Sequence, residues 1–95
     1  MKQYTVYILT NYTKTALYIG VTNNIARRLY EHTSESKGHA KRYNIRYLVY
    51  EEHFTSIRVA IAREKQLKRW SRVKKNNLIE MQNPKWKSYN DNYLV

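Results

Sequence analysis

Two short strand-forming runs joined by a polar loop constrain the fold of this chain more than any other stretch. Residues 6–9 read Val-Tyr-Ile-Leu and residues 18–21 read Tyr-Ile-Gly-Val, so β-branched and aromatic residues dominate both runs, and neither contains proline. Residues 10–15 are polar apart from one tyrosine. This pattern predicts a β-hairpin.

The pairing of the two strands decides which side chains meet. If Leu9 pairs with Ala16 as the loop closes, Tyr7 lies opposite Tyr18, with both phenols on one face. A register slipped by two residues keeps them on that face. Gly20 then leaves the sheet bare beside the phenols, as a strand glycine does where a ligand approaches. The alternative is that these are ordinary strand tyrosines, since the chain has 10 of them.

The rest of the chain predicts one α+β domain. The first strand, about residues 3–10, is apolar on both faces and is expected to be central. A helix separates the second strand from the third, which indicates a crossover. The remaining elements are a strand at 16–21, a helix at 24–33 capped by Thr22 or Asn23, a strand at 45–54, a helix capped by Thr55 or Ser56 that runs to Trp70, and a helix at 73–81.

The charge of the chain favours a polyanionic partner. Eighteen Lys and Arg stand against seven Asp and Glu, for a net charge of +11. Anionic membrane surfaces and ribosomal RNA would satisfy the same charge. With no long apolar stretch, no signal-peptide pattern and no cysteine, the chain is expected to be cytoplasmic and to lack disulfides and thiolate metal sites.

The first helix places an arginine and a histidine at the edge of its apolar stripe. Arg28 and His32 are four residues apart, and both lie within about a quarter turn of Ile25 and Leu29. They would therefore project toward whatever the helix covers. The alternative is that His32 caps the helix C-terminus and Arg28 extends to the surface.

The second helix places Glu64 within an apolar stripe. An ionised carboxylate facing a core is costly unless it is paired or bound to a cation. Pairing with Lys68 or Arg28 is one reading. Coordination of a hard divalent cation, which takes one or two carboxylates and keeps several waters, is the other.

A basic run crosses the end of this helix and the start of the next. A solvated helix face is the ordinary reading of such a run, and nucleic-acid contact is its rival, with Trp70 and Tyr43 available for stacking. The residues predicted to contact nucleic acid are Gly20, Lys41, Arg42, Arg63, Lys68, Arg69, Arg72, Lys74 and Lys75.

Five ordered motifs together resemble the GIY-YIG nuclease superfamily, in particular its small single-domain bacterial branch. Similar domains occur in the repair incision subunit UvrC and in intron-encoded homing endonucleases. The motifs here are Val6-Tyr7-Ile8, Tyr18-Ile19-Gly20, Arg28-Leu29-Tyr30-Glu31-His32, Glu64 within residues 62–68, and a terminal Asn, for which Asn83 is the candidate and Asn76 and Asn77 are competitors. The first motif departs from the family, since Val6 replaces its glycine.

The resemblance implies a three-stranded antiparallel sheet flanked by helices in the order β-β-α-β-α-α, with a nuclease domain at 1–86 and a tail at 87–95. It implies Mg²⁺ or Mn²⁺ on Glu64 and hydrolysis of DNA phosphodiester bonds, as in repair or recombination. Tyr7 would orient or deprotonate water, and Arg28 would stabilise the transition state. Tyr18 and His32 would bind the phosphate or assist proton transfer, and Asn83 would support the site.

Two other functions fit the same sequence. One is a nucleic-acid-binding module of this fold without useful catalysis, and the other is an RNA- or ribosome-associated protein, suggested by basicity alone. DNA, in duplex, branched or single-stranded form, is the expected partner ahead of RNA. The chain is expected to be a monomer.

Overall fold

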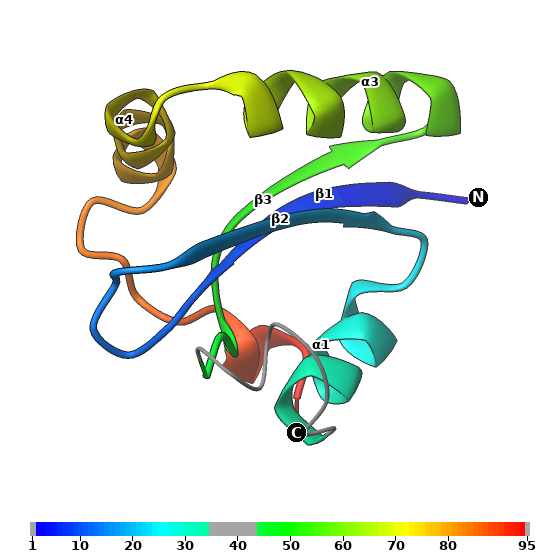
Figure 1. The fold of residues 1–95 in the computed structure, drawn as a ribbon. Coiled ribbons are helices and arrows are strands. Elements are labelled where there is room, and N and C mark those ends of the chain that lie inside the picture. Colours follow the sequence, from blue (N-terminus) through cyan, green and yellow to red (C-terminus); the bar gives the residue numbers. More distant parts are fainter. Residues whose placement is uncertain (1, 35–43, 95) are drawn as a thin grey trace.

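A computed structural model describes residues 2–34 and 44–94 of the chain. Figure 1 shows a curved sheet with helices on both faces. The elements are β1 (Tyr4–Thr10), β2 (Leu17–Thr22), α1 (Ile25–Ser34), β3 (Tyr47–Phe54), α3 (Ile57–Arg69), α4 (Arg72–Gln82) and a short 3-10 helix, η1 (Asn90–Asn92). This confirms the predicted α+β class and the order β-β-α-β-α-α.

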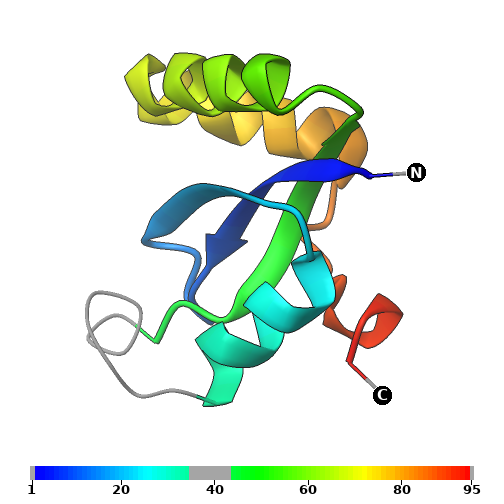
Figure 2. The same ribbon diagram turned by 90° about the vertical axis from the view of Figure 1, so that its right-hand side faces the viewer.

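The sheet has the strand order β2-β1-β3, with both neighbours antiparallel to β1. The central position of the first strand and the crossover to the third are therefore confirmed. Each face of β1 contributes to a separate core: Val6 and Ile8 pack under α3, whereas Tyr7 and Leu9 pack against α1. Figure 2 shows the helices that cover the two faces, with α3 and α4 above the sheet and α1 below it.

The predicted hairpin register is wrong by two residues. Tyr7 pairs with Gly20 and Leu9 pairs with Tyr18, where Tyr18 and Ala16 were expected. The cause lies in the loop, where the Asn11 carboxamide oxygen accepts from the backbone N–H groups of Thr15 and Ala16. These hydrogen bonds keep Ala16 in the loop, so the second strand begins to pair only after it. Because the slip is two residues, both phenols stay on one face.

The helix caps lie close to their predicted positions. Ser56 caps α3, as one of the two expected residues, and Ser71 caps α4. The cap of α1 is Asn24, whose side chain accepts from the N–H of Arg27, and not Thr22 or Asn23. The predicted apolar stripe of α3 is only partly buried, since Ala60 and Leu67 are in the core but Ile57 and Ile61 are exposed.

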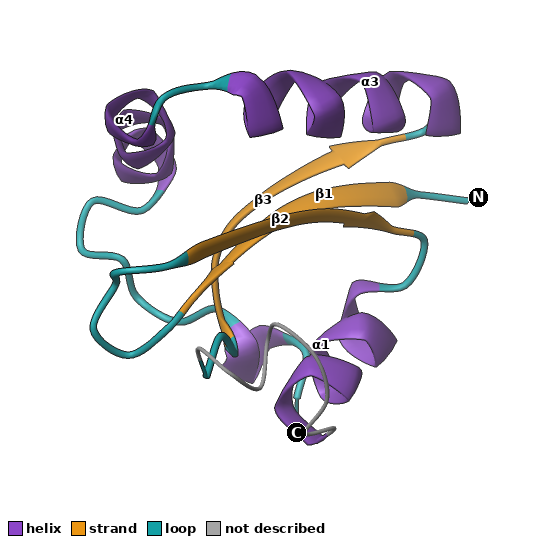
Figure 3. Ribbon diagram, viewed as in Figure 1, coloured by secondary structure: helices purple, strands orange, loops and turns teal. Residues whose placement is uncertain are grey.

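The outer edge of β3 is covered by side-chain amides and by the segment after α4. Gln82 accepts from the N–H of Glu51 and donates to its carbonyl, and Asn83 donates to the carbonyl of Val49. Asn90 accepts from the N–H of Leu48, and the N–H of Tyr89 donates to the Leu48 carbonyl. Figure 3 shows this segment in teal beside β3 before it reaches η1.

No helix in the described ranges is long and apolar enough to cross a membrane. Residues Lys41, Arg42 and Tyr43, which were predicted to contact nucleic acid, lie outside those ranges.

Candidate active site

The side chain of Tyr7 is the centre of the site, and Gly20 makes room for it. Tyr7 is 1% exposed on the central strand. Its ring crosses the strand partner Gly20 so closely that a Cβ at position 20 would lie 2.6 Å from the ring carbon Cζ and would overlap the hydroxyl. No side chain fits there without displacing the phenol, so the glycine positions Tyr7.

Arg28 joins the two phenols. Its Nε donates to the Tyr7 hydroxyl at 3.2 Å, and one terminal nitrogen lies 3.5 Å from the Tyr18 hydroxyl. The other terminal nitrogen donates to Glu31 at 3.2 Å. These contacts hold the guanidinium over the sheet, at the edge of α1, and they raise its pKa further above the usual range. Arg28 therefore carries a fixed positive charge toward the site.

His32 completes an aromatic triangle with the tyrosines. Its ring centroid lies 5.1 Å from that of Tyr18 and 6.2 Å from that of Tyr7, and the two phenol rings are 6.3 Å apart. Burial, together with the charge of Arg28, lowers the pKa of His32. Its Nε2 atom is buried and has no hydrogen-bond partner among the described residues. A buried nitrogen without a partner is costly, and a ligand or water would satisfy it.

The pKa of Tyr7 is raised, chiefly by burial of the phenol. The Arg28 hydrogen bond and charge oppose this effect, and the negative charge of Glu64 adds to it. Glu64 comes from α3, on the face of the sheet opposite α1, and among the described residues its carboxylate pairs with Lys68 and makes no hydrogen bond to Tyr7, Tyr18 or Arg28. The hairpin and α1 thus supply one group of polar side chains.

Glu64 is the one predicted metal ligand. Its side chain is 16% exposed and forms an ion pair with Lys68 at 3.2 Å. Of the two partners considered from the sequence, the structure has Lys68, because Arg28 pairs with Glu31 instead. No cluster of three or more His, Asp or Glu residues forms a metal cage within residues 2–34 and 44–94. A single carboxylate beside an exposed, flexible lysine still fits Mg²⁺ or Mn²⁺, which keep several waters.

Several residues that were predicted to contact nucleic acid make contacts within the protein. Arg63 donates to both carboxylate oxygens of Glu52, and Arg72 donates to the backbone carbonyls of Lys14 and Thr15. Lys68 pairs with Glu64. Arg69 is exposed and Lys75 is half-buried. The basic run therefore divides into arginines that join elements and cations that face solvent.

Asn83 lies at the opposite edge of the sheet from β2. It is 5% exposed, and its amide donates to the carbonyls of Val49 and Lys87 and accepts from the N–H of Lys87. Its hydrogen-bond partners are thus backbone groups of β3 and of the turn after α4. The structure brings Tyr7, Tyr18, Arg28 and His32 together. In the described ranges, neither Glu64 nor Asn83 makes a hydrogen bond or ion pair with these four side chains.

Sequence reasoning missed Glu31 as a partner of the site. It lies three residues after Arg28, a spacing that puts two helical side chains side by side and predicts an ion pair. The signal was present in the sequence.

The fold is a small α+β domain, and a match to a protein family shows that it is of nuclease type. The family model described as the GIY-YIG catalytic domain matches residues 3–77, and the chain belongs to this family of nucleases. A solution NMR structure of the UPF0213 protein BH0048 from Bacillus halodurans is similar, with a TM-score of 0.57 and 27% sequence identity over 98% of this chain and 97% of that one. No curated protein matches the sequence.

Proposed function

We propose that this chain is a divalent-metal-dependent DNA endonuclease that acts in repair or recombination. The observation that carries the proposal is the bridge that Arg28 makes between the hydroxyls of Tyr7 and Tyr18. Phosphodiester hydrolysis needs positive charge beside the phosphate, a proton acceptor and a water position, and this group of side chains supplies them.

Each residue has a separate part in the proposed reaction. Glu64 would hold Mg²⁺ or Mn²⁺, which when bound stabilises negative charge on the phosphate and the leaving oxygen. Arg28 stabilises the charge that develops on the phosphate oxygens in the transition state. The Tyr18 hydroxyl donates to a phosphate oxygen, and the Tyr7 hydroxyl orients the attacking water.

Attack by water forms one P–O bond, breaks another and releases a proton that an acceptor must take. Because burial raises the pKa of Tyr7, this phenol keeps its proton at neutral pH in the cation-free protein. His32 is neutral there, and Nε2 accepts when the ring proton is on Nδ1. Tyr7 becomes the acceptor only if further positive charge beside Arg28 lowers its pKa.

We assign Asn83 a structural part in this function rather than a place beside the phosphate. Its amide already makes hydrogen bonds to backbone groups at the β3 edge, about two strand spacings, or roughly 10 Å, from β2. The same reasoning assigns Arg63 and Arg72 to the fold, and leaves Arg69 and Lys75 as the cations that face DNA.

The second candidate function is a DNA-binding module without catalysis. The ion pair between Lys68 and Glu64 favours it, because an ammonium group already satisfies the carboxylate that would hold the cation. In this case the protein would bind DNA in a salt-dependent manner and cleave none.

The Glu64→Gln variant tests the proposal. It keeps the shape of the side chain but removes the charge, so we expect cleavage of labelled duplex, branched or single-stranded DNA with Mn²⁺ or Mg²⁺ to fall at least about 100-fold, with folding and DNA binding retained. EDTA should have the same effect on the wild type.

Glu80→Gln is the matched control, because Glu80 lies on α4 and accepts from the indole N–H of Trp86, which a glutamine oxygen can still do. It should cleave at the wild-type rate. Cleavage by Glu64→Gln at the wild-type rate would contradict the mechanism, and a folded wild type that cuts no substrate would favour the binding module.

A further inference from the structure

A hollow at the hairpin end of the sheet belongs to neither the phenol site nor the basic helices. It has a volume of about 390 Å³, within the range of ligand sites in proteins. The end of β1, the hairpin loop, the first residue of β3 and the segment after α4 form its walls. Its lining includes Tyr12, Tyr47, Trp86 and the cation Lys14.

One ring of this lining, that of Tyr12, is exposed, whereas Tyr47 and Trp86 are half-buried, as is Trp70, which was expected to stack on nucleic acid. Arg63 and Lys74 lie over Trp70, with Cζ and Nζ at 5.2 Å and 4.2 Å from the ring centroid, and Trp70 packs against the core under α3. Tyr12 is 80% exposed. The hollow therefore offers an exposed ring for stacking, that of Tyr12, beside two half-buried ones.

The backbone holds two lining residues in an unusual conformation. Lys14 and Trp86 have φ angles of 61° and 54°, in the left-handed region that non-glycine residues seldom adopt. The indole N–H of Trp86 also donates to Glu80 at 3.1 Å, which fixes the ring. Such conformations concentrate at ligand sites, and a ring fixed in advance loses little entropy on binding.

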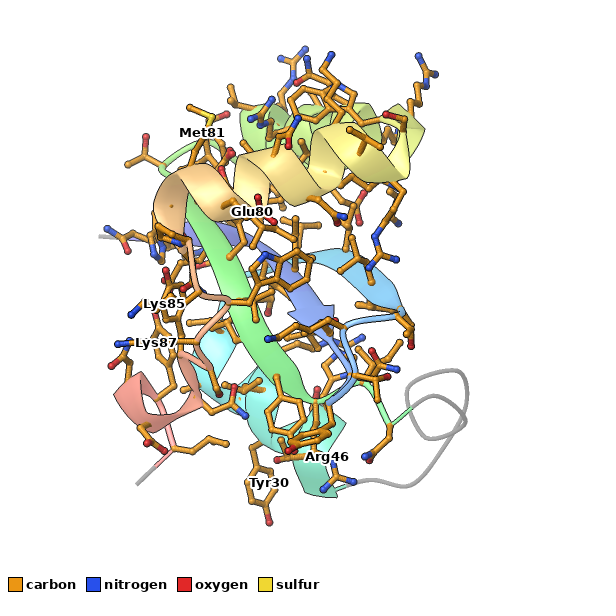
Figure 4. All side chains as sticks on the ribbon, turned by 90° about the vertical axis from the view of Figure 1, so that its left-hand side faces the viewer. Tyr30, Arg46, Glu80, Met81, Lys85 and Lys87 are labelled. Carbon is orange, nitrogen blue, oxygen red and sulfur yellow. The ribbon has the colours of Figure 1, made fainter. Side chains whose placement is uncertain are left out.

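The charge around the hollow favours a polyanion. Lys14 is the one cation among the lining residues. Figure 4 shows this side of the molecule, which carries three further cations, Lys85, Lys87 and Arg46, and one labelled carboxylate, that of Glu80. Polar groups of the lining are already engaged: the Asn11 amide closes the hairpin loop, and the Ser88 hydroxyl accepts from the N–H of Asn90. The hollow thus offers stacking and positive charge, with little hydrogen bonding to read a base.

We propose that this hollow binds an unpaired nucleotide of the DNA substrate, with its base on Tyr12, Tyr47 or Trp86 and its phosphate on Lys14. The bases of a duplex are stacked on each other and present no free face, so the hollow selects single-stranded parts without regard to sequence. Thr10 in its wall is three residues along β1 from Tyr7, about 10 Å. The inference deepens the proposed function: the preferred substrate has unpaired nucleotides near the cleaved bond.

Binding without metal separates this inference from catalysis. The probe is a labelled ten-nucleotide oligothymidine in EDTA, followed by fluorescence anisotropy, with a duplex of equal length beside it. Tyr12→Ala should weaken oligothymidine binding about five-fold or more and leave duplex binding unchanged. Tyr30→Ala is the matched control, since Tyr30 is an exposed tyrosine on α1.

Two further measurements locate the contact. Lys14→Gln should reduce the dependence of log K on log salt for the oligothymidine by about 0.7, more than Lys2→Gln does. In a Trp70→Phe background, where Trp86 is the remaining tryptophan, the oligothymidine should quench the fluorescence saturably.

Equal effects of Tyr12→Ala and Tyr30→Ala, equal losses on duplex and single strand, or saturable binding without quenching would each overturn the inference. Oligothymidine binding that depends on Tyr12, from a protein that cleaves nothing, would keep the inference and reject the endonuclease.

Discussion

Burial has the same electrostatic consequence for two different side chains of the site. It raises the pKa of Tyr7 and lowers that of His32, so both favour their neutral forms at neutral pH. Arg28 is then the group that presents positive charge to a phosphate, and its contacts with the phenols keep it oriented. The polar character of the site depends on one arginine held by neutral rings.

The low pKa of His32 predicts how stability depends on pH. Because the folded state disfavours protonation below the ordinary value of about 6.5, the unfolded state binds more protons there. The free energy of unfolding should therefore fall as pH decreases from 6.5 through the lowered pKa. Urea denaturation between pH 5 and pH 8 measures this slope.

The His32→Gln variant should flatten the slope of unfolding free energy against pH. The His53→Gln variant is the control, because it leaves His32 and its contribution to the slope in place. An unchanged slope in His32→Gln would show that protonation of this ring is not coupled to folding.

At the scale of single residues, the sequence was sufficient where spacing alone decides the geometry. The separation of Arg28 and His32 by four residues placed both on one helix edge, and the apolar neighbours of Glu64 predicted its partial burial. What spacing could not supply was the partner of each group. The choice between Lys68 and Arg28 for Glu64 depended on how α1 and α3 pack on the sheet.

Among the elements, α4 ends in side chains that complete the sheet. Gln82 and Asn83 direct their amides to the outer edge of β3, so the end of the helix and the strand are one hydrogen-bonded unit. A carboxamide has the same donor and acceptor groups as a backbone peptide, and it can therefore replace a strand that is absent.

Asn83→Ala tests this structural role. It leaves the buried Val49 carbonyl and the part-buried N–H of Lys87 without their side-chain partner, so the free energy of unfolding should fall by about 2–4 kcal/mol. Asn77→Ala, at an exposed position of α4, should change it by less than about 0.5 kcal/mol. Chemical denaturation gives both values.

If Asn83 only supports the fold, the cleavage rate of the folded Asn83→Ala protein should equal that of the wild type. A lost rate with unchanged stability would instead put Asn83 in the catalytic site.

The elements were predictable to within a few residues because their signals are local. Alternating strand residues and serine caps are read along the chain without knowledge of the fold. The hairpin register was missed because the Asn11 side chain sets it, and loop composition does not reveal that hydrogen bond. The position of the tail along β3 was missed for a similar reason, since Asn90 bonds to backbone far away in sequence.

In the whole molecule, the net charge of +11 overstates the number of cations that are free to contact a polyanion. Arg63 joins α3 to β3 and is partly neutralised by Glu52, whereas Arg72 is exposed on α4 and uses its guanidinium to hold two carbonyls of the hairpin loop. The number of cations available on the surface is therefore smaller than the composition indicates.

The salt dependence of duplex binding in EDTA distinguishes the two kinds of cation. Arg69→Gln and Lys75→Gln should each reduce the slope of log K against log salt by about 0.9, with stability unchanged. Arg72→Gln should lower the free energy of unfolding by about 1–2 kcal/mol, because two backbone carbonyls lose a charged donor, and should change the slope less. A full change of slope in Arg72→Gln would place this residue on DNA.

The covered edge of β3 also limits how copies of this chain can associate. Exposed strand edges add further strands, and a sheet with two free edges can grow without end. Here β2 and β3 are both end strands, and amides and the segment after α4 occupy the outer edge of β3, whereas nothing in residues 2–34 and 44–94 pairs with the outer edge of β2. Each chain therefore has one strand edge available for pairing. Two chains can join through β2, and no third chain can extend the pair.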